Sequence, residues 1–98
     1  MEKVIPAKIK VLANGQNLIV KQMISNSGAL LPKHSADVES MIFIHEGECV
    51  LSMNGELQTL KAGDAFCIPA QQIHQFKAIT DFIGIHIMPK EIKFQFFD

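Results

Sequence analysis

The side chains best suited to chemistry in this chain are its four histidines, His34, His45, His74 and His86. A neutral imidazole binds transition metals through one ring nitrogen, and it can also donate or accept hydrogen bonds inside a ligand pocket. No serine or cysteine has a base at a recognisable local spacing, so the sequence gives no support for covalent catalysis, and no catalytic residue is assigned. The histidines therefore predict either a metal site or a polar anchor in a binding pocket.

Glycine, proline and histidine recur at matching intervals in two stretches of the chain. Their spacing resembles the two signatures of the cupin superfamily, usually written G-x5-H-x-H-x3or4-E-x6-G and G-x5-P-x-G-x2-H-x3-N. The residues that carry the resemblance are Gly28, His34, Gly47, Gly63, Pro69 and His74. The match covers residues 28–78. It implies an all-β fold, the cupin double-stranded β-helix or jelly-roll barrel, and a chain of 98 residues predicts a single domain spanning 1–98.

Several chemistry-bearing positions of the signatures are altered. A typical cupin binds a divalent metal inside the barrel with three histidines and one glutamate. Here the second histidine position is Ala36, and the glutamate position is Ser40. The glycine and asparagine of the second signature are Gln71 and Ala78. The His-x-Ala pattern is similar to that of a subgroup of small bacterial cupins, which implies a specialised site but supplies no reaction.

The family register implies which side chains face the barrel interior, because successive residues of a strand point to opposite faces. The residues expected to form a ligand pocket are His34, Ser40, Ile42, Ile44 and His74. Glu39, Met41, Phe43 and His45 would face away from the interior.

Metal binding and metal-free ligand binding both stay open. His34 and His74 would bind Zn, Ni, Fe, Mn or Cu, but catalytic metal sites usually have at least three protein ligands. His86 could supply the third imidazole if its face of the strand points inward, and Glu39 could contribute only if a β-bulge redirected it. No cofactor is certain, and a divalent metal is the one that the histidines suggest.

Composition excludes several classes of partner. The nine basic residues are all lysines, are scattered, and leave a net charge of −1, so nucleic acid is not an expected partner. Without arginine, phosphorylated substrates are disfavoured. No apolar run approaches the roughly 20 residues of a membrane helix, and the first residues lack a signal peptide's apolar region. We therefore expect a cytoplasmic protein with no membrane association.

Turn signals recur between short apolar or alternating segments, which favours a sandwich or barrel of strands over helices. Asn14-Gly15 and Asn54-Gly55 are type I′ turn signals. Met41 to Ile44 and Phe82 to Met88 are apolar strands, and residues 93–97 are a candidate last strand. Cys49 and Cys67 are predicted to be buried, reduced thiols.

Three functions follow from these patterns. The favoured hypothesis is a barrel that binds a small, uncharged, mainly apolar ligand, oriented by His34 and His74. The alternative is a metal-dependent oxygenase, isomerase or lyase. A third hypothesis is a scaffold that acts through a homodimer, with Met41, Phe43, Phe94 and Phe96 as the apolar contact surface.

Overall fold

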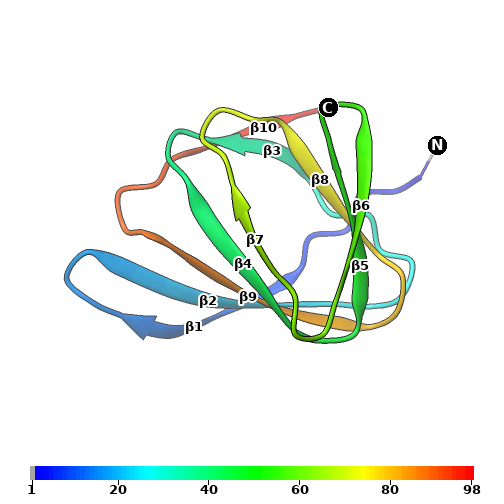
Figure 1. Cartoon of the computed structure of the whole chain (residues 1–98), viewed down its shortest axis with the longest axis horizontal. Helices are drawn as coiled ribbons and strands as arrows, with labels where there is room; N and C mark the ends of the chain where they lie inside the picture. Colours follow the sequence, from blue (N-terminus) through cyan, green and yellow to red (C-terminus); the bar gives the residue numbers. More distant parts are fainter. Residues whose placement is uncertain (1) are drawn as a thin grey trace.

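The computed structural model describes residues 2–98, and the regular structure of that part of the chain is entirely β. The strands form two five-stranded antiparallel sheets (Figure 1). The first sheet has the order β1 (Lys8–Asn14), β2 (Leu18–Ser25), β9 (Phe82–Pro89), β4 (Ser40–Glu46) and β7 (Ala65–Ile68). The second has the order β10 (Phe94–Phe97), β3 (Lys33–Ala36), β8 (His74–Ala78), β5 (Glu48–Met53) and β6 (Glu56–Lys61). These two layers are the double-stranded β-helix that the glycine and histidine spacing implied.

The core lies between the two sheets, and strand alternation explains its composition. On β4, Ile42 and Ile44 are at most 1% exposed, whereas Phe43 between them is 37% exposed. On β5, Cys49 and Leu51 face the same interior. The inward faces therefore form one apolar layer, and its open end becomes the site described below.

β9 is the central strand of the first sheet and alternates without interruption. Its inward residues Phe82, Gly84, His86 and Met88 are buried, and the isoleucines between them are half-buried on the outside. β9 thus places His86 in an apolar interior. A buried imidazole needs a hydrogen-bond partner nearby, because burying an unpaired polar group is costly.

The two predicted type I′ turns have different outcomes. Asn54 and Gly55 have φ values of 56° and 76°, as that turn requires, so this prediction is confirmed. Neither Asn14 nor Gly15 has a positive φ, and the β1–β2 hairpin instead closes with a bond from the Gly15 amide to the Leu18 carbonyl of 2.8 Å. The type I′ prediction at Asn14-Gly15 is therefore wrong.

Gly47 shows why the first signature ends in glycine. Its φ is +80°, and a Cβ at this position would lie 2.0 Å from the Asp81 carbonyl oxygen. The turn from β4 into β5 therefore passes against the start of β9 with no room for a side chain.

Two further features add to what the sequence indicated. Lys33–Ala36 forms strand β3, because it pairs with β10 on one side and β8 on the other. Cys67 was expected to be buried, but it is exposed, because its β7 position faces outward; both Cys49 and Cys67 are free thiols. Within residues 2–98, no helix has the length and hydropathy needed to cross a membrane.

Candidate ligand-binding site

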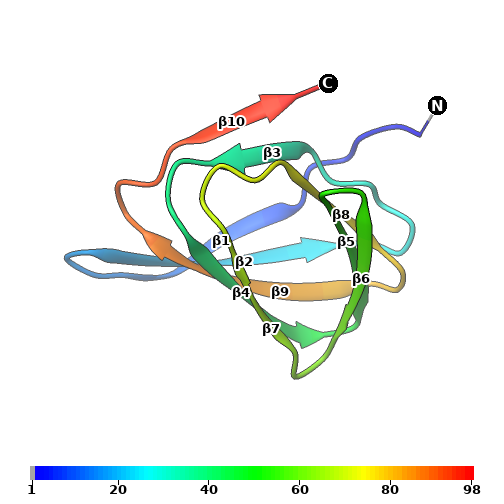
Figure 2. The same ribbon diagram turned by 45° about the horizontal axis from the view of Figure 1, so that its top comes forward.

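A cavity of about 260 Å³ is lined by residues of β1 and β2 on one side and of β3 and β10 on the other. Figure 2 shows where these four strands lie in the fold. The cavity wall is mainly apolar, with two imidazoles and one lysine. The lining residues are Pro6, Ala7, Ile9, Lys21, Met23, Leu31, Pro32, His34, Phe76, His86, Met88, Phe94 and Phe96. Ligand sites are commonly concave and apolar with a few convergent polar groups, and this cavity fits that description.

His34 and His74 are direct cross-strand partners in the β3–β8 pairing. Their ring centroids lie 4.5 Å apart at an interplanar angle of 63°. His34 lines the cavity, and His74 is buried at 3% exposure beside it. Pairing of two distant strands thus brings the two signature histidines together on one inward face.

Each of these rings is oriented by a backbone carbonyl two residues earlier. Nδ1 of His34 lies 3.1 Å from the Pro32 oxygen, and Nδ1 of His74 lies 2.9 Å from the Gln72 oxygen. A carbonyl oxygen only accepts, so each Nδ1 carries the proton. Nε2 is then left as an acceptor in the neutral ring, and for His74 this atom is buried without a partner among residues 2–98.

His86 finds its polar partner in Ser40. Its Nε2 lies 2.8 Å from Ser40 Oγ, and both side chains are buried. In the sheet register His86 stands opposite Lys21 of β2 and opposite Ile42 of β4. The hydroxyl at the family's glutamate position therefore satisfies an imidazole nitrogen.

All three interior histidines favour the neutral form. Burial lowers the pKa of His34 and of His74, against the opposing effect of their carbonyl bonds. For His86 burial lowers the pKa to about 4, with smaller contributions from His34, His74 and Lys21. The cavity therefore presents uncharged imidazoles near neutral pH.

β10 covers the histidines with aromatic rings. Phe94 pairs with Ala36 and Phe96 pairs with His34, which places both phenyl groups on the inward side. The Phe94 ring centroid lies 5.3 Å from that of His34 and 6.3 Å from that of His86. The small Ala36 side chain, where the family has a histidine, thus lies opposite an aromatic wall of the cavity.

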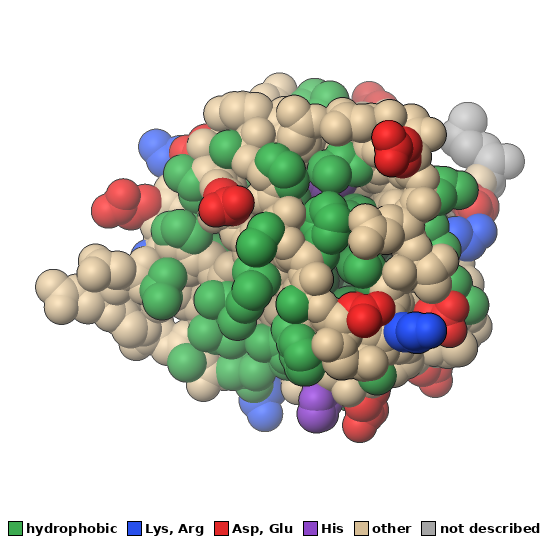
Figure 3. Space-filling view, in the orientation of Figure 1, with side chains coloured by type: hydrophobic (Ala, Val, Ile, Leu, Met, Phe, Trp, Pro, Cys, Tyr) green, Lys and Arg blue, Asp and Glu red, His purple; other side chains and the backbone are tan. Residues whose placement is uncertain are grey.

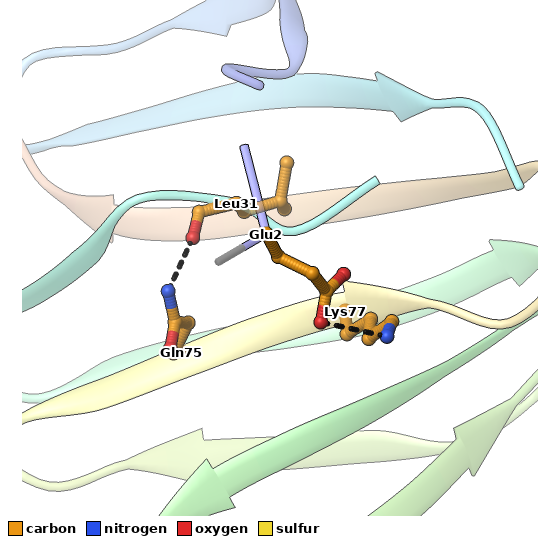
Figure 4. A network of polar contacts seen from close by, with 4 residues as sticks. All are labelled: Glu2, Leu31, Gln75 and Lys77. Carbon is orange, nitrogen blue, oxygen red and sulfur yellow. Dashed lines mark hydrogen bonds and ion pairs between the residues drawn. The ribbon is translucent and has the colours of Figure 1, made fainter. Parts of the chain in front are cut away.

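Contacts between residues that are far apart in the sequence hold the segment next to Leu31 in place (Figure 4). Gln75 Nε2 donates to the Leu31 carbonyl at 2.9 Å, and the Lys77 ammonium pairs with Glu2 at 3.0 Å. Val4 also bridges to Leu30, next to the cavity-lining Pro6 and Ala7. The N-terminal segment is therefore fixed as one wall of the cavity.

The candidate pocket residues named from the sequence occupy different places. His34 lines the cavity, His74 lies behind it, and Ser40 reaches it only through His86. Ile42 and Ile44 belong to the packed core instead of the cavity wall. Glu39 and His45 are exposed.

Other lining residues were missed. Phe94 and Phe96 were interpreted as part of a dimer surface, but they line the cavity. Lys21 and Met23 were not singled out, although alternation along the second strand places them on one face. That face could have been identified as inward only by knowing that Lys21 pairs with His86.

The donor set does not fit a resident catalytic metal. Within residues 2–98, the Nε2 atoms of His34 and His74 make no hydrogen bond, whereas that of His86 is bonded to Ser40. Ala36 brings no donor atom, and residues 2–98 contain no group of three or more metal-binding side chains. Two ligands fall short of the three that catalytic sites usually have, so we derive no step through a metal.

A second hollow, of about 330 Å³, lies beside the β5–β6 hairpin. It is lined by Leu51, Met53, Asn54, Glu56, Leu57, Gln58 and Phe66. It is somewhat larger than the histidine cavity, but none of the described residues that line it is a histidine. We therefore assign the candidate site to the histidine cavity.

Comparison with protein families decides the family of this chain. The model of the cupin domain matches residues 22–87, a range that includes both histidines of the pair and His86. The chain belongs to the cupin family. No curated protein matches this cupin significantly.

Solved structures share the fold at low sequence identity. A conserved protein with a double-stranded β-helix domain from Klebsiella pneumoniae has a TM-score of 0.83 and 19% identity, over 95% of this chain and 85% of that one. A cupin superfamily protein from Desulfitobacterium hafniense has a TM-score of 0.79 and 17% identity, over 91% and 82%. Salicylate 1,2-dioxygenase from Pseudoaminobacter salicylatoxidans has a TM-score of 0.74 and 18% identity, over 82% of this chain but 24% of that one. At such identities these matches establish the cupin barrel alone.

Proposed function

We propose that this cupin binds a compact, mainly apolar small molecule in the histidine cavity and has no resident metal. The observation that carries the proposal is the cavity itself. It holds about 260 Å³ between phenylalanine and methionine side chains, with two imidazoles in its wall. Drug-sized ligands occupy pockets of about 300–1,000 Å³, so the natural ligand is smaller than these.

Apolar contacts supply the affinity in this proposal. Met23, Met88 and the two β10 phenylalanines surround the space and bury the body of the ligand. His34 fixes the orientation, because it is the lining imidazole whose Nε2 makes no hydrogen bond within residues 2–98. Among the described residues that line the cavity, Lys21 is the one with a charged side chain.

The competing proposal is a metal-dependent enzyme, as the salicylate dioxygenase neighbour would suggest. Its support is the pair of carbonyl-oriented imidazoles, since that is how metal-binding histidines are held. The missing third and fourth donors at Ala36 and Ser40 count against it. Binding without a metal accounts for both substitutions, because Ser40 has a different partner and Ala36 faces an aromatic ring.

The binding proposal is tested by titrating a library of compact apolar molecules, such as toluene and its relatives, while recording methionine methyl shifts. We expect saturable shifts at Met23 and Met88, and none at Met53, which lies at the other hollow. Ala7→Trp should fill the cavity and abolish these shifts, whereas Ala62→Trp, in the exposed turn between β6 and β7, should keep them. A library without any saturable shift, or shifts that persist in Ala7→Trp, would contradict the proposal.

We also infer a homodimer formed through the outer face of the first sheet. This outer face contains apolar side chains that are neighbours across four strands: Val20, Ile24, Met41, Phe43, Ala65, Cys67, Ile83, Ile85 and Ile87. Figure 3 shows hydrophobic side chains gathered where β4 and β7 lie in Figure 1. Contiguous apolar surface of this kind is typical of self-association.

The dimer is tested by light scattering at tens of micromolar. Wild type should have twice the chain mass, and Ile85→Lys at the centre of the outer face should be a monomer. Leu57→Lys is the matched control, since Leu57 is 75% exposed on β6, outside that face. A monomeric wild type would overturn the dimer and leave the cavity proposal intact.

A further inference from the structure

The hydrogen-bonding character of the cavity is set by two tautomers. The Pro32 and Gln72 carbonyls accept from Nδ1 of His34 and His74, at 3.1 and 2.9 Å. A neutral imidazole has one N–H and one lone pair, so both Nε2 atoms are acceptors. None of the residues from 2 to 98 that line the cavity carries a carboxylate that could stabilise a second proton on either ring. The Nε2 atom of the lining His34 is therefore a hydrogen-bond acceptor.

The burial of the two acceptors favours a small donor. His34 lines the cavity, and Nε2 of the neighbouring His74, whose ring centroid lies 4.5 Å from that of His34, is buried without a partner among residues 2–98. Among common donors a hydroxyl is smaller than an amide or an ammonium, so it needs the least space beside a buried ring. A buried acceptor without a donor is costly, which makes a donating ligand group complementary here.

The remaining polar groups favour an acidic hydroxyl. Ser40 and His86 are bonded to each other at 2.8 Å. Lys21, which stands opposite His86 in the sheet, forms no ion pair with any residue from 2 to 98. Its positive charge disfavours an amine ligand and favours a group that carries partial negative charge. A phenolic hydroxyl donates strongly and carries such a charge.

The wall next to His34 suits an aromatic body. The Phe94 and Phe96 ring centroids lie 5.3 and 5.5 Å from that of His34, one edge-on and one tilted. Aromatic groups prefer edge-to-face and offset contacts at such separations. A flat ring packed against these phenyl groups, whose own centroids lie 6.5 Å apart, would place its hydroxyl toward His34.

We propose that the ligand of this cavity is a phenol, a compact aromatic molecule whose hydroxyl donates to Nε2 of His34. The proposal rests on the proposed function and adds the chemical class of the ligand. It assigns His34 the role of ligand acceptor and His74 that of a second acceptor behind it. His86 keeps its hydrogen bond to Ser40 and makes none to the ligand.

Phenol and its methyl ether, anisole, are the probes, because they share a ring and differ in the donor. Titration followed by methionine methyl shifts should show phenol binding at least about tenfold more tightly than anisole, since anisole leaves the acceptor unpaired. His34→Phe keeps an aromatic ring and removes the acceptor, so it should abolish the preference for phenol over anisole. His45→Phe, at an exposed β4 position, should retain the preference.

A second measurement covers the case in which His34→Phe does not fold. In wild type, the ¹⁵N shift of His34 Nε2 should start at the value of an unprotonated acceptor and move on adding phenol but not anisole. Equal affinity for the two probes, or an unmoved Nε2 resonance, would overturn the phenol assignment and leave apolar binding intact. Failure of both probes to bind would overturn the proposed function together with it.

Discussion

Ser40 Oγ and His86 Nε2 share a buried hydrogen bond of 2.8 Å, although the residues lie 46 positions apart in the chain. Ser40 stands where the family's metal-binding glutamate belongs. Its hydroxyl satisfies an imidazole on the central strand of the first sheet. Serine at position 40, in place of the family's glutamate, removes a carboxylate ligand. Its hydrogen bond to His86 also keeps this third histidine from replacing that ligand.

Removing this hydroxyl should destabilise the barrel. Ser40→Ala leaves His86 Nε2 buried without a partner, and we expect a loss of about 1–3 kcal/mol in the free energy of unfolding. Chemical denaturation measures this loss. Ser52→Ala, at a half-buried β5 position, is the control and should change stability by less than about 0.5 kcal/mol. Equal stabilities of the two variants would show that the Ser40 bond contributes nothing net.

Acid should destabilise the protein in a defined window. The pKa of His86 is lowered from 6.5 to about 4 by burial and by His34, His74 and Lys21. Since the unfolded chain protonates this residue first, stability should be constant above about pH 6.5 and fall as the pH drops toward 4. The loss due to His86 should approach roughly 3 kcal/mol.

Unfolding free energies measured between pH 4 and 8 test this expectation. His86→Gln should have a shallower pH dependence than wild type, whereas His45→Gln, an exposed control, should keep the wild-type slope. A stability that rises on acidification through this window would contradict a neutral His86.

Metal content separates the two functional proposals. Protein purified without a tag and saturated with Zn, Ni, Fe, Mn or Cu should retain far less than one equivalent after dialysis, because two imidazoles hold a metal weakly. Mass spectrometry of wild type and His74→Ala gives the measurement. Stoichiometric metal that disappears in the variant would favour the metal-dependent enzyme over the binding module.

The loop before β8 should tolerate the replacement of Gln71 by glycine, the residue that the second cupin signature has at this position. Gln71 has a φ of 69°, a left-handed conformation that costs a residue with a Cβ about 1–2 kcal/mol. Gln71→Gly should relieve that strain and, after the entropy cost of glycine, raise stability by up to about 1 kcal/mol. Thermal unfolding measures the change.

The neighbouring substitution is the matched control. Gln72 lies in the same loop without a positive φ, so Gln72→Gly should lower stability, because glycine adds unfolded-state entropy with no strain to relieve. A destabilised Gln71→Gly would mean that the Gln71 side chain contributes more than its backbone strain costs.

The sequence by itself determined the fold class and most of the strands. Alternation and turn residues are local properties, so β4, β8 and β9 could be predicted from runs such as Met41 to Ile44. The resemblance of the glycine and histidine motifs to the cupin signatures implied the barrel and the pair His34 and His74. The inward direction of Ser40, Ile42 and Ile44 also followed from that register, and all three are buried.

Only the tertiary structure decided which inward residues surround a space and which fill the core. β3 exists because distant strands pair with it, and Phe94 lies in the cavity because β10 stands opposite Ala36. The partner of His86 depends on the packing of β4 against β9. These relations join residues far apart in the chain, so no local periodicity records them, and the site's chemistry is a product of strand pairing.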